Sequence, residues 1–116
     1  MTTETRPKKP LTFEQDLSAS ALSYTTTWTR KFKLSKITFK ASQNITETIT
    51  ITYLSANGSG YDTVSRQITL SAESDYIYRP TGDDVFIDSD GIKVECTNAN
   101  GVGTIRGEIK AREVLN

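Results

Sequence analysis

Apolar and polar residues alternate with period two along most of this chain, and such alternation predicts strands that bury one face in a core. The clearest example is 45–54, where the odd positions carry most of the apolar side chains and the even positions from 46 to 52 carry threonine. The apolar residues are Ile45, Ile49, Ile51 and Tyr53. We therefore expect a strand with an apolar inner face and an outer row of hydroxyl groups, formed by Thr46, Thr48, Thr50 and Thr52.

The segment 29–40 predicts a second strand that contains a β-bulge. Phe32 and Leu34 stand on even positions, whereas Ile37 and Phe39 stand on odd positions. One extra residue near Ser35 and Lys36 would return both pairs to the same face of a sheet.

A hairpin is predicted from 45–54 to the return strand 61–70, because Asn57-Gly58 supplies the positive φ angles that tight turns need. Val64, Ile68 and Leu70 share one parity on the return strand and are expected to point inward, with Arg66 as the exception.

The rest of the chain predicts further short strands between turn signals, and no window holds the 3.6-residue apolar period of a helix for long. The weak pattern of 11–28 suits an edge strand or an extended segment, with a short helix over 13–19 as the alternative. Firmer strands are expected at 75–79, 85–88, 92–97 and 102–114. Seven or eight strands predict an all-β fold, a single-domain antiparallel β-sandwich of the jelly-roll or immunoglobulin-like kind, or a small barrel. We expect an extended N-terminal arm over 1–12 and the β-sandwich domain over 13–116.

The composition narrows the function classes. A chain of 116 residues suits one domain with one core, no apolar run approaches the roughly 20 residues of a membrane span, and no secretory signal is visible. The sequence has no histidine, which removes the commonest general base, and one cysteine, Cys96, expected to be a small buried apolar residue. We therefore expect no enzyme, no catalytic residues, no cofactor and no membrane association.

Formal net charge is zero, but residues 1–40 hold eight basic residues against three acids, whereas 41–116 hold six against eleven. This asymmetry suits stacking of copies or docking on a charged neighbour, unless strands from the two halves mix on folding. Arg30, Lys31 and Lys33 beside Phe32 offer the pairing that single-strand nucleic-acid binders use. The zero charge and a core position for Phe32 favour no nucleic-acid partner.

Two further groups of residues are candidates for binding. Four carboxylates in neighbouring turns could hold Ca²⁺, which takes several oxygen ligands; they are Asp83, Asp84, Asp88 and Asp90. Turn formation explains the same aspartates. Six aromatic residues could form a sugar-binding platform, although most are expected in the core; they are Tyr24, Trp28, Tyr53, Tyr61, Tyr76 and Tyr78. Gly107 is expected to make room for a bulky neighbour such as Trp28 or Tyr78, in place of any role in a phosphate loop.

The chain contains, in order, the strand LSKITFKAS, the hairpin ITETITITYLSANGSGYDTVSRQITL, a proline-led turn, the segment GIKVECTN and the closing strand GTIRGEIKARE. Over residues 30–113 this order resembles small structural proteins of tailed-bacteriophage virions. The resemblance implies a non-enzymatic virion protein made in the host cytoplasm, such as a capsid decoration or cement protein, with a head–tail or tail adaptor as the alternative. It implies other virion proteins as partners, the major capsid protein foremost, and a homo-oligomer or multicopy assembly.

Such a subunit binds its neighbours through a large contact surface, through extended arms and through the edges of its strands. We therefore expect partner-binding residues in the arm, at Arg6, Lys8 and Lys9, and on the threonine row, at Thr46, Thr48, Thr50 and Thr52. The arm is expected to add nothing to the thermal stability of the domain. A carbohydrate-binding β-sandwich module remains the alternative from a different class.

Overall fold

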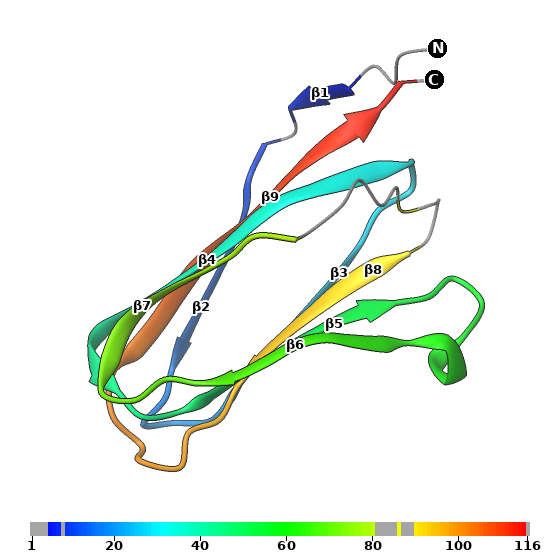
Figure 1. Ribbon diagram of the computed structural model, residues 1–116. Coiled ribbons are helices and arrows are strands. Elements are labelled where there is room, and N and C mark those ends of the chain that lie inside the picture. The colour runs from blue at the N-terminus through cyan, green and yellow to red at the C-terminus, as the bar shows by residue number, and fades with distance from the viewer. Residues whose placement is uncertain (1–4, 8, 81–85, 87–89, 116) are drawn as a thin grey trace.

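The computed structural model describes residues 5–7, 9–80, 86 and 90–115, and these residues form an antiparallel β-sandwich (Figure 1). No described residue lies in an α-helix; one short 3₁₀ turn, Ser59–Tyr61, interrupts a loop. The strands are β1 (Thr5–Pro7), β2 (Leu11–Asp16), β3 (Leu22–Thr27), β4 (Phe32–Ile45), β5 (Thr48–Leu54), β6 (Thr63–Thr69), β7 (Glu73–Tyr78), β8 (Gly91–Cys96) and β9 (Thr104–Val114). The all-β prediction is confirmed.

Two sheets face one another across the core (Figure 1). Sheet A has the order β2-β9-β4-β7, and β1 continues along the same edge of β9 beyond β2. Sheet B has the order β3-β8-β5-β6. This strand order is that of a jelly roll, one of the two sandwich types that the sequence left open. The described residues hold nine strands instead of seven or eight, because 11–28 contains two strands and Thr5–Pro7 forms another. Of the strand expected at 85–88 only Phe86 is described, and it forms an isolated bridge with Phe32.

Strand β4 contains the predicted bulge. Its register with β9 shifts between Leu34 and Lys36. Phe32 and Leu34 before the shift, and Ile37 and Phe39 after it, are all buried. The bulge therefore lets one strand of 14 residues keep its apolar side chains on the core face.

The helix considered for 13–19 does not form, because these residues belong to β2 and the turn that follows it. In that turn, one carboxylate oxygen of Asp16 accepts hydrogen bonds from the backbone N–H of Ser18 at 2.9 Å and from its hydroxyl at 2.6 Å. These bonds outweigh desolvation and lower the pKa of Asp16. Strand β2 lies on an edge of sheet A and β3 on an edge of sheet B, which confirms the edge-strand expectation.

The predicted hairpin is present as β5 and β6, and Gly58 adopts the positive φ of 120° that its turn requires. The prediction for Val64 was wrong: its side chain is 58% exposed. The register shifts between Ile51 and Thr52, so that Arg66 lies opposite Ile51 and Val64 lies opposite Thr52, with Ser65 as the extra residue. This second bulge turns Val64 to the outer face of sheet B.

The core lies between the sheets and is lined by side chains of alternate parity from both. A chain of ring contacts crosses it from Trp28 to Phe32 at 4.0 Å between centroids, from Phe32 to Phe86 at 4.6 Å, and from Phe86 to Tyr53 at 4.9 Å. Cys96 is buried, as predicted, and burial together with the nearby charge of Glu47 raises the pKa of its thiol to about 11.

Gly107 makes room for an aromatic ring, but the neighbour predicted from the sequence was wrong. A Cβ at position 107 would collide with the ring of Phe13 and with the carbonyl oxygen of Thr38. Phe13 lies opposite Gly107 on β2 and Phe39 lies opposite it on β4, and the two rings are 5.3 Å apart. The glycine therefore lets β2 place Phe13 over the centre of sheet A.

The segment expected to be an arm contributes to sheet A. Thr5–Pro7 pairs with Val114 to Arg112 of the same chain, and β2 begins at Leu11, so that it crosses the boundary expected between residues 12 and 13. Contact between residues 1–12 and a neighbouring subunit stays a prediction. The pairing also mixes the two oppositely charged halves of the chain, because β9 lies between N-terminal strands.

Candidate functional site

The predicted threonine row lies on the outer face of sheet B. Residues with the same orientation on the neighbouring strands extend it, and together they form what we term the threonine face: Ser23, Thr25, Thr48, Thr50, Gln67, Thr69, Lys93 and Glu95. The hydroxyl oxygens of Thr48 and Thr69 are 3.0 Å apart, and the Gln67 amide donates to the Thr50 hydroxyl at 3.1 Å. Lys93 and Glu95 add one ion pair at 3.8 Å.

The two ends of the predicted row differ from its middle. Thr46 is exposed in the connection between β4 and β5, where its hydroxyl accepts a hydrogen bond from the Ala72 N–H at 3.1 Å. Thr52, which the alternation also turns outward, is 8% exposed and therefore buried. Thr48 and Thr50 are half-buried. The hydroxyls open to a partner are thus those of Thr46, Thr48 and Thr50.

The predicted residues of the arm are separated in the structure. The Arg6 guanidinium is 2.6 Å from a carboxylate oxygen of Glu113, and Arg30 is 3.4 Å from the other oxygen. Glu113 is only 3% exposed. Lys9 is exposed, and Lys8 lies outside the described residues. Arg6 therefore has an intramolecular role that the sequence did not reveal.

The calcium candidates fall mostly outside the described residues, since Asp83, Asp84 and Asp88 belong to that part of the chain. Asp90 is described, and it joins loops: its carboxylate accepts the Ala56 N–H at 2.8 Å and its carbonyl accepts the Trp28 N–H at 3.3 Å. Within the described ranges, no three acidic, cysteine or histidine residues lie close enough together to hold a metal ion.

A buried carboxylate that the sequence analysis missed is Glu47, which is 2% exposed between β4 and β5. It accepts hydrogen bonds from the Thr97 hydroxyl at 2.7 Å, the Ala99 N–H at 2.9 Å and the Asn100 N–H at 2.8 Å. Burial raises the pKa of Glu47, but the three hydrogen bonds outweigh it and hold the pKa below its usual range. Glu47 therefore fixes the loop after β8 as an anion, and its position among inward-facing isoleucines was the signal for it.

The aromatic residues do not form an exposed platform. Trp28 and Tyr78 are buried, and Tyr24, Tyr53 and Tyr76 pack against the core. Tyr61, at 70% exposure, is the one of the six that faces solvent. Phe32 is fully buried beside the basic residues of β4, so it offers no ring for stacking on a nucleic-acid base.

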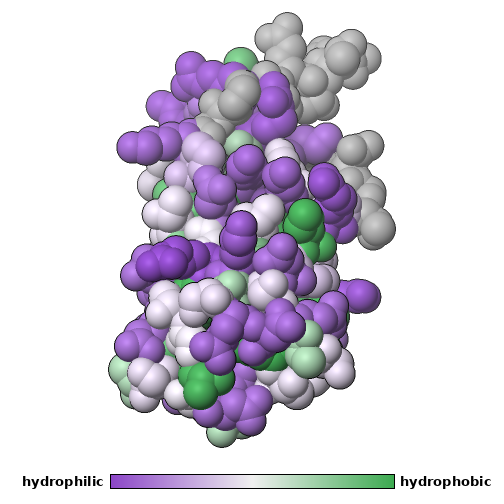
Figure 2. All heavy atoms as spheres, turned by 90° about the vertical axis from the view of Figure 1, so that its left-hand side faces the viewer, coloured by the Kyte–Doolittle hydropathy of each residue, from purple (hydrophilic) through white to green (hydrophobic). Residues whose placement is uncertain are grey.

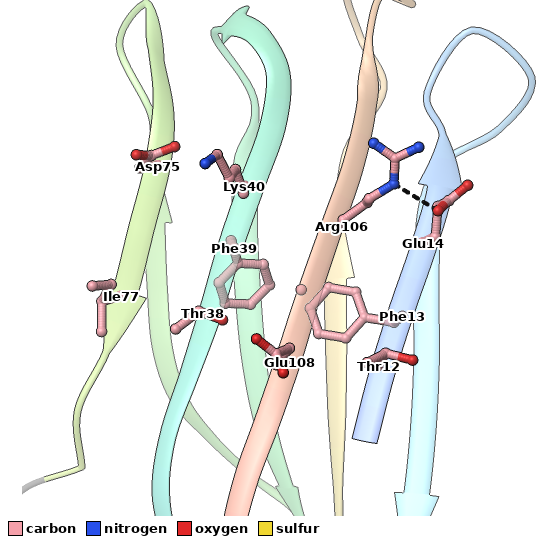
Figure 3. A pocket seen from close by; sticks show the side chains of 11 residues that line it. Thr12, Phe13, Glu14, Thr38, Phe39, Lys40, Asp75, Ile77, Arg106 and Glu108 are labelled. Atoms are coloured by element: carbon pink, nitrogen blue, oxygen red, sulfur yellow. Dashed lines mark hydrogen bonds and ion pairs between the residues drawn. The ribbon is translucent and has the colours of Figure 1, made fainter. Parts of the chain in front are cut away.

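The outer face of sheet A carries a groove of about 430 Å³, which we term the sheet-A groove (Figure 3). Four charged residues cross it in one row of paired positions, Glu14 on β2, Arg106 on β9, Lys40 on β4 and Asp75 on β7. Glu14 and Arg106 form an ion pair at 2.7 Å. A second row contains Thr12, Glu108, Thr38 and Ile77.

The sheet-A groove combines polar and apolar surface. Phe13, Phe39 and Gly107 also line it, and Ile77 is 50% exposed at its edge. Hydrophilic residues dominate this side of the molecule, with apolar residues in small separate spots (Figure 2). The groove offers three carboxylates, two basic groups and two hydroxyls to a ligand, which suits a polar ligand of modest size.

Two comparisons by sequence found no match for this chain. No protein-family model matches the chain, and no curated protein matches it in sequence. Within the described residues, no helix is long and apolar enough to cross a bilayer.

Proposed function

We propose that this protein is a non-enzymatic structural subunit of a tailed-phage virion, a decoration or cement protein that binds the major capsid protein. The threonine face carries the proposal. It offers hydroxyl groups on adjacent strands of one sheet, and two of its cross-strand pairs are already hydrogen-bonded. Threonine is β-branched and stiff, so little side-chain entropy is lost when such a face is covered.

The fold supports this proposal by analogy. Double-sheet jelly rolls occur in viral capsid proteins, and also in lectins and cupins. Fold alone does not give function. The analogy therefore supports the proposal only in combination with the resemblance of the strand and turn order to phage structural proteins. A head–tail or tail adaptor would use the same kind of contacts and would differ in its place on the particle.

The test is assembly with particles of the major capsid protein encoded in the same genome. Wild-type chain should cosediment with the particles at a fixed copy number. Thr48→Lys plus Thr50→Lys should keep the fold, measured by circular dichroism, and lower the copy number at least tenfold, because two ammonium groups must then be desolvated in the contact.

The matched control carries the same substitutions on the other sheet, Thr12→Lys plus Thr38→Lys. These residues line the sheet-A groove, and the control should assemble like the wild type. Full assembly of the threonine-face variant would overturn the proposed contact, and failure of the wild-type chain to cosediment would overturn the proposed function.

The sheet-A groove supports a second candidate, carbohydrate binding. Its carboxylates and threonine hydroxyls can accept and donate hydrogen bonds to sugar hydroxyls, and its volume suits a small ligand. A panel of soluble glycans should then raise the melting temperature by mass action. Thr12→Lys plus Thr38→Lys should abolish that rise, whereas the threonine-face variant should keep it; no rise with any glycan would remove this candidate.

A further inference from the structure

A second cleft lies where the two sheets end on the same side of the sandwich. Strand β6 is the last strand of sheet B and β7 is the last strand of sheet A. Between them lies a cleft of about 420 Å³, which we term the edge cleft, lined by Ser65, Arg66, Tyr76, Ile77, Tyr78 and Arg79. Among the described residues, neither β6 nor β7 has a strand paired to its outer edge.

The bulge in β6 builds one wall of the edge cleft. Because Ser65 is the extra residue, Arg66 takes the core-facing position opposite Ile51 and reaches the cleft from the edge of the sheet. The Tyr78 hydroxyl closes the inner end, 2.5 Å from the Ser65 hydroxyl and 2.6 Å from the Tyr53 hydroxyl. The cleft therefore ends in hydroxyl groups that join the two sheets.

Both charged residues that line the edge cleft are arginines. Arg66 and Arg79 are exposed, and neither forms an ion pair with a described residue. Three other arginines differ: Arg6 and Arg30 contact Glu113, and Arg106 contacts Glu14. Guanidinium groups bind carboxylates in a two-pronged geometry, and arginine and tyrosine are enriched where binding energy is concentrated.

Apolar surface lies on both sides of these charges. Ile77 on β7 is 50% exposed, and Val64 on β6 is 58% exposed. Strand β7 keeps a continuous register with β4 from Asp75 to Tyr78, so its outer edge is straight enough to accept another strand. Strand β6 is bulged and carries an inward-facing arginine, and both features oppose strand addition.

We propose that the edge cleft binds an extended acidic segment of a partner protein. The segment adds a strand to the free edge of β7, places carboxylates against Arg66 and Arg79, and lays an apolar side chain on Ile77. The proposal rests on the assembly role above for the source of the segment, and it adds a contact at the side of the sandwich, apart from the threonine face.

Binding is measured on the isolated full chain by fluorescence polarisation with a labelled peptide of eight alternating glutamate and valine residues. A peptide of alternating lysine and valine is the charge-reversed probe. The acidic peptide should bind at least tenfold more tightly than the basic one, and Arg66→Ala plus Arg79→Ala should weaken it at least tenfold. The control Arg106→Ala removes an exposed arginine outside the cleft and should leave binding unchanged.

Equal binding of the two peptides, or full binding by the Arg66→Ala plus Arg79→Ala variant, would overturn the proposal. In the competing role, the charge of Arg66 prevents strand pairing between copies of this chain. Arg66→Ala alone should then make the chain self-associate in sedimentation velocity while peptide binding stays unchanged. That result would also overturn the proposal. Peptide binding by a chain that fails to join virion particles would contradict the assembly role and leave the cleft assignment standing.

Discussion

Two buried carboxylates, Glu47 and Glu113, are stabilised in opposite ways. Glu47 receives hydrogen bonds from one hydroxyl and two backbone N–H groups of the loop after β8. Glu113 lies between Arg6 and Arg30, whose side chains are 64% and 72% exposed. Neutral dipoles fixed in one loop hold the first charge, whereas two solvated cations from distant segments hold the second. The first arrangement fixes a loop, and the second joins the N-terminal strand to the rest of sheet A.

The largest effect is expected for Glu47→Ala. The variant removes three hydrogen bonds to a charged acceptor, and because the freed N–H groups lie in an exposed loop and regain some water, we expect a loss of about 3 kcal/mol in the free energy of unfolding. Glu47→Gln keeps the shape and one acceptor oxygen, so it should lose about half as much. Urea denaturation measures both, and a loss below about 1 kcal/mol for Glu47→Ala would contradict the anchoring role.

A smaller effect is expected for Glu113→Ala. Its partners are exposed and return to water when the carboxylate is removed, so the loss should be about 1–2 kcal/mol in the same measurement. If Glu113→Ala destabilised the chain more than Glu47→Ala, the contrast between fixed dipoles and solvated cations would fail.

The pH dependence sharpens the comparison. The pKa of Glu47 is lower in the folded chain than its ordinary value of 4.5, so its contribution to stability is complete above that value and is lost as pH falls through the lower folded pKa. The stability difference between wild type and Glu47→Gln should therefore shrink below about pH 4.5. Asp16→Asn serves as a positive control: the pKa of Asp16 is also lowered, so the stability difference between wild type and this variant should shrink at low pH in the same way. A difference that stays constant from pH 7 to pH 3 would contradict an ionised Glu47.

The smallest effect is expected for Arg6→Ala, because Arg30 still faces Glu113. We expect a loss of about 0.5–1 kcal/mol at low salt that falls in 1 M NaCl, since salt screens an exposed cation. The effect of Glu47→Gln should not change with salt.

Deletion of residues 1–10 should lower the thermal midpoint by a few degrees, because it also removes β1. An unchanged midpoint would support the free arm expected from the sequence.

The alternation predicted most of the buried faces, with Val64 and Thr52 as exceptions, but apart from the β5–β6 hairpin the sequence did not predict which strands are neighbours. The bulge in β4 was predictable because the apolar pairs before and after it stand on opposite parities. The bulge in β6 had one indication in the sequence, the charged Arg66 on the same parity as the apolar residues of that strand. Glu47 was visible as an acid on the inward parity. Its donors were not, because Thr97 and Asn100 are brought to it only when β8 pairs with β5. The place of Arg79 beside Arg66 likewise depends on two sheets ending on the same side.

The position of β9 in sheet A has a consequence for synthesis. The last strand of the chain lies between β4 and the pair β1 and β2, and it connects residues such as Leu11 and Ile109 from opposite ends of the sequence. While the chain emerges from the ribosome, β2 has no partner in sheet A, and Phe13 has no Gly107 to pack against. Sheet A can therefore close only after translation passes residue 114, and until then its unpaired strand edges are prone to aggregate.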